Sequence, residues 1–291
     1  MSATRDSVGI RLVAGWVGDN DMSSIASSLP VFGPIQAAYF WFKNRKRARL
    51  LESWAKEKGL DFASDGGGFS APSNPARSED ASTLGRHSGK AVEVFSRMIG
   101  LSKIQASFPQ FASNRLRGDW QSDKNICWGS YKGYTVVVWD TVYYDLNTGQ
   151  SSVDWTEGEY TSILVLCDAP IHRTLITPHS LGKRLSAFGI EEGRGMFGMS
   201  TVQFELDAFN KAYRVKATDD RWTFAIIDQA MMEWLLSQKK HTIELAPGGV
   251  TVSTWFTLDT GQIDEQLDFI VGFLDRIPED LKHSTHSVSG E

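Results

Sequence analysis

The chain has 291 residues, of which 41% are hydrophobic and 22% are charged, proportions that are ordinary for a globular protein with a sizeable core. The formal net charge of -5 and the pI near 5.7 argue against a dedicated nucleic-acid-binding protein, so no nucleic acid is expected as a partner. Cys127 and Cys167 lie in apolar strand patterns. Whether they are adjacent stays open, and two buried thiols in a reducing compartment are the simpler interpretation.

Residues 1–60 are predicted to be an anchor-like segment that is first hydrophobic and then basic. The apolar run at 25–42 ends in aromatic residues and is followed at once by basic residues, an order typical of the cytoplasmic end of a membrane anchor. Pro34 suits the first turn of a helix that continues through residues 48–59, which leaves too few apolar residues to cross a bilayer. Three interpretations stay open: a weak or kinked transmembrane span, an interfacial or re-entrant anchor, and a soluble helix with a solvated basic face.

The aromatic and basic side chains at the end of this run are the candidate contacts with a membrane. A basic cluster beside an apolar segment attracts anionic lipid headgroups. The candidates are Tyr39, Trp41, Phe42, Lys43, Arg45, Lys46, Arg47 and Arg49. The expected partner is therefore a membrane surface contacted through residues 25–49, together with a protein partner that the sequence does not identify.

Residues 61–90 are predicted to be a flexible linker, because DGGGFSAPSNPARSEDAS is rich in Gly, Ser, Pro and Asp and poor in apolar residues. The triplet Gly66, Gly67, Gly68 is not a phosphate-binding loop, since no strand precedes it and no Gly-Lys-Ser/Thr follows. Residues 91–281 are predicted to fold as one domain, and residues 282–291 to form a disordered tail.

Strand patterns joined by glycine turns are frequent in the predicted domain. Turns at 132–133 and at 247–249 each separate two runs of β-branched and aromatic residues, which predicts two hairpins. Residues 160–167 are apolar on both faces and predict a central strand. Residues 171–177 predict a fourth strand.

Residues 202–237 predict a structural nucleus of two strands and a helix. Apolar and polar residues alternate at 202–206 and again at 213–217. Asp219 or Asp220 is placed to cap a following helix, which is predicted to continue to Ser237 with one broad apolar face.

Further helices are predicted at 181–188 and at 263–277, the second ended by Pro278, with a glycine-rich loop at 189–198. Hairpins and helices in separate blocks indicate an α+β fold: an antiparallel sheet built from hairpins with a few packed amphipathic helices, preceded by an N-terminal hydrophobic and basic helix.

No motif for catalysis, cofactor binding or metal binding is recognisable. The six histidines show no HxxxH spacing, and no Cys-x-x-Cys accompanies them. No GxSxG nucleophile elbow is present, so the sequence shows no serine in the motif that presents the nucleophile of a serine hydrolase. The pair Asp219-Asp220 is interpreted as a helix cap, and Glu191-Glu192 as part of an exposed loop. We therefore predict no catalytic, cofactor-binding or metal-binding residue and no cofactor.

Residues 114–282 resemble an uncharacterised family of actinobacterial membrane-anchored proteins. The resemblance is carried by NRLRGDW leading to WGSYKGYTVVVWD, by FELDAFNKAYRVKATDDRWTFAIIDQAMMEWL, and by VTVSTWFTLDTGQIDEQLDFIVGFLDRIPEDL. The N-terminal order, with RLLESWAKEKGLDF after the basic cluster, is also similar. This chain departs from the family in a hydrophobic segment that is broken by prolines. The resemblance implies an architecture but no activity.

Three functions are compatible with these patterns. The leading hypothesis is a non-enzymatic accessory or interaction protein, tethered at the cytoplasmic face of a membrane by its N-terminal segment. The second is a soluble, cytoplasmic enzyme with a pocket between the sheet and the helix of residues 220–237. The third is a soluble partner-binding module whose basic helix docks on an acidic protein.

Overall fold

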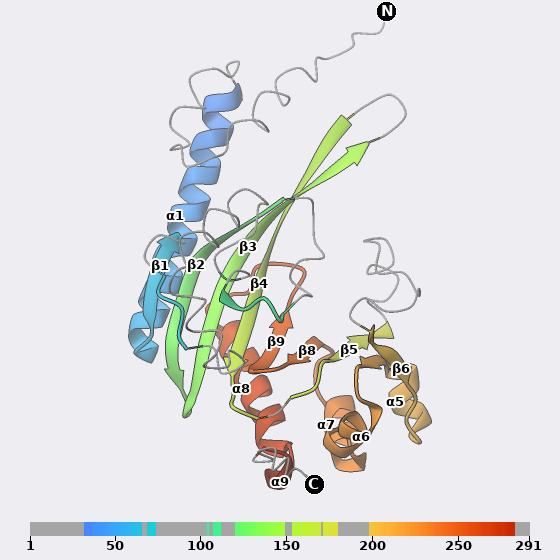
Figure 1. Cartoon of the computed structure of the whole chain (residues 1–291). Coiled ribbons are helices and arrows are strands. Elements are labelled where there is room, and N and C mark those ends of the chain that lie inside the picture. Colours follow the sequence, from blue (N-terminus) through green and yellow to red (C-terminus); the bar gives the residue numbers. More distant parts are fainter. Residues whose placement is uncertain are drawn as a thin grey trace, which may run out of the picture. The chain divides into compact units, whose positions relative to one another are not determined.

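The computed structural model describes residues 32–65, 69–73, 104, 107–111, 120–148, 153–169, 171–179 and 198–282 (Figure 1). The backbone contacts divide the chain into Met1–Leu50 and Leu51–Glu291. The second unit begins well before the predicted domain boundary at residue 91. It combines a large antiparallel sheet with several helices, which confirms the predicted α+β class.

In the described part of the chain, nine strands form one sheet in the order β1-β2-β3-β4-β9-β8-β5-β7-β6. Every neighbouring pair is antiparallel. The strands are β1 Asp61–Asp65, β2 Trp120–Tyr131, β3 Tyr134–Thr148, β4 Val153–Leu166, β5 Thr174–Pro178, β6 Ser200–Val202, β7 Tyr213–Ala217, β8 Thr242–Ala246 and β9 Gly249–Ser253.

Both predicted hairpins are confirmed. Lys132 and Gly133 join β2 to β3 with φ of 49° and 85°, the pair of positive φ values that a two-residue type I′ turn requires. Gly248, at φ 91°, lies in the turn between β8 and β9, and Ala246 pairs with Gly249 directly beside it. The twist of a type I′ turn matches that of the strands, so the register of the β2–β3 hairpin is set locally.

The middle of the sheet is covered on both faces. Val136 and Val138 of β3 belong to the main hydrophobic cluster, whereas Val137 and Trp139 face a second cluster with Phe108. Successive side chains of a strand point to opposite faces of the sheet. A strand that is covered on both faces is therefore expected to have a continuous run of apolar residues. β4 shows the same division and is the fourth strand of nine, which confirms it as central.

The helices are α1 Phe32–Lys58, α5 Asp207–Ala212, α6 Asp220–Ile226, α7 Gln229–Ser237, α8 Thr260–Arg276 and α9 Glu279–Lys282. Pro34 occupies the first turn of α1, as expected. α8 begins with a capping box between Asp259 and Gln262. It packs on β4 and β9 with its buried stripe facing the main cluster (Figure 1), and it ends just before Pro278, as predicted.

Two predictions for the nucleus at 202–237 are wrong in detail. The strand predicted at 202–206 ends at Val202. Asn210 accepts a hydrogen bond from the Phe204 N–H and donates one to the Phe204 C=O, so its side chain takes the place of a neighbouring strand. The helix α5 then begins at Asp207. The predicted helix 220–237 is divided at Asp228, whose carboxylate caps α7 by accepting from the Met231 N–H. The Asp219 side chain caps α6 by accepting from the Trp222 N–H, as predicted. The strand β7 also has the predicted bounds.

Residues 61–65, which were assigned to the linker, form β1 and pair with β2 from Trp128 to Lys124. Pairing with an existing strand supplies the backbone hydrogen bonds that this polar segment could not specify by itself. Most of the remaining predicted linker, the predicted helix at 181–188, nearly all of the loop at 189–198 and residues 283–291 lie outside the described residues.

Candidate functional site

The predicted lipid-contacting side chains lie on α1. Phe42 is 65% exposed; Lys43, Arg45, Lys46 and Arg49 are exposed and Arg47 is half-buried. The side chains of Tyr39 and Trp41 lie outside the described part. At 3.6 residues per turn, the five basic side chains between 43 and 49 cover about 200° of the helix circumference. The side that carries Asn44 and Ala48 has no basic residue. Among the described residues, no helix is both long enough and apolar enough to cross a membrane.

The space between the sheet and residues 220–237 is filled rather than hollow. Ile226, Ile227, Met231 and Leu235 are each at most 2% exposed and belong to the main hydrophobic cluster with residues of β5, β7 and β8. The Tyr213 hydroxyl donates to the Leu235 carbonyl in the same interior. A dry, packed interior offers no room for a substrate, so it gives no support to the predicted enzyme pocket.

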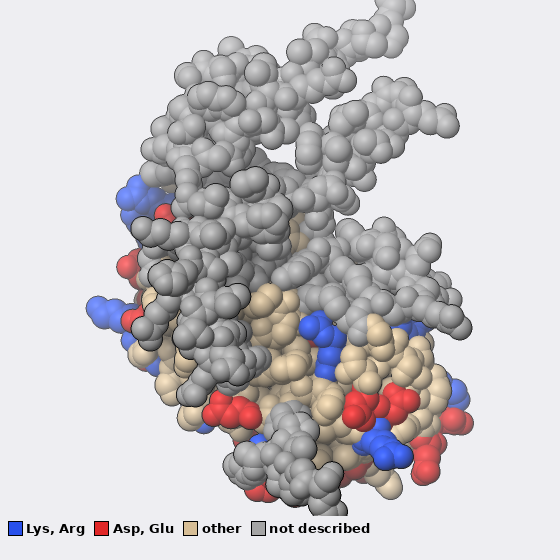
Figure 2. Space-filling model, in the orientation of Figure 1, with Lys and Arg blue, Asp and Glu red and all other residues tan. Residues whose placement is uncertain are grey.

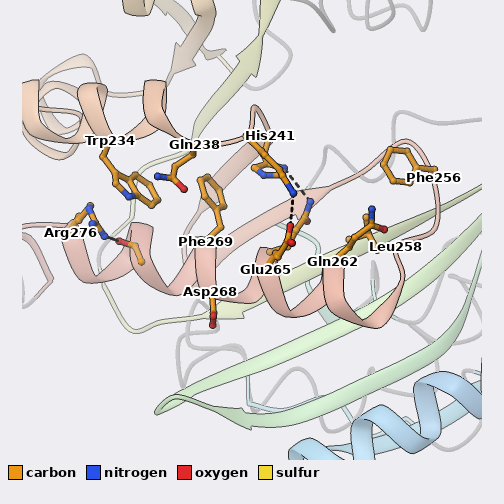
Figure 3. A pocket seen from close by; sticks show the side chains of 13 residues that line it. Trp234, Gln238, His241, Phe256, Leu258, Gln262, Glu265, Asp268, Phe269 and Arg276 are labelled. Atoms are coloured by element: carbon orange, nitrogen blue, oxygen red, sulfur yellow. Dashed lines mark hydrogen bonds and ion pairs between the residues drawn. The ribbon is translucent and has the colours of Figure 1, made fainter.

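A groove of about 650 Å³ lies instead along the outer side of α8 (Figure 3). Its walls come from α8, from the end of α7 with the segment leading to β8, and from the loop between β9 and α8. The lining residues are Trp234, Gln238, Lys239, His241, Phe256, Leu258, Gln262, Glu265, Gln266, Asp268, Phe269, Gly272 and Arg276.

One end of the groove is closed by Trp234. Its indole is stacked on Phe269, with centroids 5.2 Å apart and planes at 11°, and the Arg276 guanidinium lies 4.5 Å from the ring. Figure 3 shows Trp234 between these two side chains. The Arg276 Nη1 also donates to the Gly272 carbonyl at 2.7 Å. Trp234 is therefore a packed wall, since neighbours cover its ring.

The middle of the groove contains a polar pair. His241 Nδ1 and Gln266 Nε2 are 3.1 Å apart, and the imidazole lies on the Phe269 ring with centroids 4.8 Å apart. Burial, assisted by the charge of Lys239 and opposed by that of Glu265, lowers the pKa of His241 to about 4. The ring is therefore neutral at pH 7. Gln266 is only 6% exposed, and its Oε1 has no hydrogen-bond partner in the described structure.

The other end of the groove is formed by Phe256 and Leu258. Phe256 is 57% exposed, whereas Leu258 is buried. An exposed phenylalanine and a part-buried polar pair give the groove one apolar contact surface and one hydrogen-bonding centre. Within the described residues, no group of three or more His, Cys, Asp or Glu side chains is placed to hold a metal ion.

None of the groove residues was predicted as functional from the sequence. They come from separate elements between positions 234 and 276, so no linear motif unites them. One signal was present: Gln266 lies between Ile263 and Ile270 on the apolar stripe of α8, where a polar residue has to be explained. The predicted lipid contacts and the groove are separate sets of residues.

Comparison with known proteins gives no family assignment. No family model matches the chain, and no curated protein matches it. One solved structure that is similar is described as the crystal structure of the mycobacterial trehalose monomycolate transport factor A, TtfA; it is 14% identical, with a TM-score of 0.42, and the match covers 79% of this chain and 96% of that one. That protein is actinobacterial, like the family that the sequence resembles. A similarity of this size carries no argument about function.

Proposed function

We propose that this chain is a non-enzymatic accessory protein that associates with an anionic membrane surface through α1 and presents its α+β unit to a protein partner. The observation that carries the membrane half of this proposal is the exposed basic segment of α1. Lys43, Arg45, Lys46 and Arg49 are exposed in a chain whose formal net charge is -5.

The segment differs in charge from the rest of the described surface. Residues 42–49 contain five basic residues and no acidic one. By contrast, acidic and basic side chains are interspersed over the α+β unit on the face drawn in Figure 2. A local positive charge on an otherwise acidic protein attracts an anionic surface at short range, because salt screens the remaining charges. The exposed Phe42 adds an apolar group that can enter the headgroup region.

Flotation of the full-length protein with vesicles tests this proposal. Neutral phosphatidylcholine vesicles are compared with vesicles containing 30% phosphatidylglycerol (about one anionic lipid in three). The test variant carries Arg45→Glu, Lys46→Glu and Arg49→Glu. The matched control carries Lys211→Glu, Arg221→Glu and Lys240→Glu at exposed positions of the α+β unit, which gives it the same net charge.

The wild type and the control are expected to float with anionic vesicles at low salt. Each basic residue near the surface contributes about 1 kcal/mol, so loss of three should weaken binding by about 100-fold. Flotation that persists in high salt would favour a hydrophobic anchor over a purely electrostatic one. Wild-type protein that stays unbound, or two triple variants that bind equally, would contradict the proposal.

A further inference from the structure

The groove contains a buried acceptor without a partner. Gln266 Oε1 is shielded from solvent and lacks a hydrogen bond in the described structure, although the side chain lines an open groove. Leaving a buried polar atom unsatisfied costs free energy, which a donor from a bound molecule would recover. The Gln266 oxygen is therefore a candidate acceptor for a ligand that carries an N–H or O–H donor.

His241 supplies the complementary group. Because an amide nitrogen can only donate, Gln266 Nε2 donates to His241 Nδ1, and the neutral ring carries its proton on Nε2. The pair therefore has one donor, His241 Nε2–H, and one acceptor, Gln266 Oε1, outside the hydrogen bond between the two side chains. Rotating the amide by half a turn exchanges the two roles and still leaves one donor and one acceptor.

The backbone of an extended chain matches this pair, since each residue except proline presents one N–H and one C=O to the same side of the strand. The lining residues of α8 run from Gln262 to Arg276, which corresponds to about 21 Å of helix. An extended chain rises about 3.3 Å per residue, so the groove has room for about six residues. Phe256, exposed at one end, can contact an apolar side chain of that segment.

Other ligand classes fit less well. The ring of Trp234 is covered by Phe269 and Arg276, so it gives no free face on which a sugar could stack. Lys239 is paired with Glu265 at 2.6 Å, and Arg276 is held by Trp234 and the Gly272 carbonyl. Both cations are already engaged, so an anionic headgroup would have to compete for them.

We propose that the groove along α8 binds an extended, largely uncharged peptide segment of a partner protein. The N–H of one of its residues donates to Gln266, the C=O of the same residue accepts from His241, and an apolar side chain packs on Phe256. The proposal rests on the partner-binding half of the proposed function and is independent of the membrane half. Its test contains no lipid, so the two can fail separately.

The test begins with selection of a random dodecapeptide library on the full-length protein. The most enriched peptide is then measured against the wild type and three variants by fluorescence anisotropy. Gln266→Leu removes the acceptor while keeping a similar volume, and Phe256→Ala removes an exposed side chain. Phe224→Ala is the matched control, because Phe224 is also exposed, at 47%, and does not line the groove.

We expect a loss of at least about 10-fold in affinity for Gln266→Leu and for Phe256→Ala, and no change for Phe224→Ala. N-methylation of one particular peptide nitrogen should weaken binding to the wild type by a similar factor but cost nothing more in Gln266→Leu, because the same bond is already missing. Three results would overturn the proposal. They are a selection that enriches no peptide, a peptide affinity that is unchanged in both groove variants, and a protein that binds to a glycan array but to no peptide. Since Phe256 is exposed, its variant is informative even if Gln266→Leu does not fold.

Discussion

Trp54 Nε1 donates a hydrogen bond of 3.1 Å to Asp264 Oδ1, which joins the end of α1 to α8 across 210 positions of the sequence. Lys58 adds an ion pair with the same carboxylate at 3.0 Å. Leu51, Trp54 and Ala55 are all buried in the main cluster. Residues 51–58 are therefore part of the α+β unit and not merely a continuation of the basic segment.

Replacement of Trp54 by alanine should lower the free energy of unfolding by about 3–5 kcal/mol, because it removes a buried aromatic side chain as well as the bond to Asp264. The measurement is urea unfolding followed by far-UV circular dichroism. Lys56→Ala, an exposed change two residues further along the same helix, should stay within about 0.5 kcal/mol of the wild type. Equal stability of the two variants would show that this part of α1 does not support the domain.

The tip of the β2–β3 hairpin is attached to α8 by a second pair of contacts. Tyr134 Oη donates to Asp275 Oδ1 at 2.8 Å, and Tyr131 Oη donates to Asp268 Oδ1 at 2.7 Å. Tyr134→Phe should cost about 0.5–1.5 kcal/mol at pH 7. Burial and the bond to Asp275 raise the pKa of Tyr134 to about 12.

This raised pKa predicts how stability changes in alkali. The unfolded chain loses the phenol proton near pH 10 while the folded chain keeps it, so the stabilisation is complete below pH 10 and is lost as the pH rises toward 12. Urea unfolding at pH 8 and pH 11 should therefore show a smaller difference between wild type and Tyr134→Phe at the higher pH. A constant difference would contradict the assignment.

Gly249 is placed where β9 approaches β4 too closely for a side chain. A Cβ atom there would overlap the Val165 carbonyl oxygen and lie 3.2 Å from Leu166 Cα. Both are backbone atoms of a central strand and cannot turn aside, so Gly249→Ala should cost about 1–3 kcal/mol or more. Gly261→Ala is the matched control. Its Cβ would lie 3.4 Å from Asp259 Oδ1, an ordinary contact, and alanine should be neutral or stabilise α8 by up to about 1 kcal/mol. Thermal unfolding of both variants distinguishes the two sites.

Elements with strong local signals were predictable from the sequence. The turn residues Lys132 and Gly133 specify one hairpin, and the repeat from Ile263 to Ile277 specifies α8, because both depend on neighbours in sequence. β1 was not predictable. Its sequence, DFASD, has little strand character and becomes a strand through its pairing with β2, which is a tertiary effect.

The candidate groove was not predictable for the same reason. His241, Phe256 and Gln266 come from three separate segments of the chain, and they line one groove only through the packing of the folded protein. The exposed basic residues of α1 could be identified because a run of charge is visible in sequence. The predicted pocket at 220–237 is not found because Met231 and Leu235 fill the space beneath α7. The pattern of apolar residues in a sequence does not distinguish a filled interior from a hollow one.

His241 should make the stability of the protein depend on pH in the acidic range. Its pKa of about 4 in the folded protein lies below the ordinary value of 6.5, so the unfolded chain binds a proton between these values while the folded chain does not. The free energy of unfolding should therefore fall as the pH decreases from about 6.5 to 4, by up to about 3 kcal/mol. His241→Gln lacks this proton and should lose less stability over the same interval. Urea unfolding at pH 7.5 and 4.5, on either side of the pI near 5.7, measures the difference. If both proteins lose the same stability, folding does not lower the pKa of His241, and burial of the ring has no effect on its protonation.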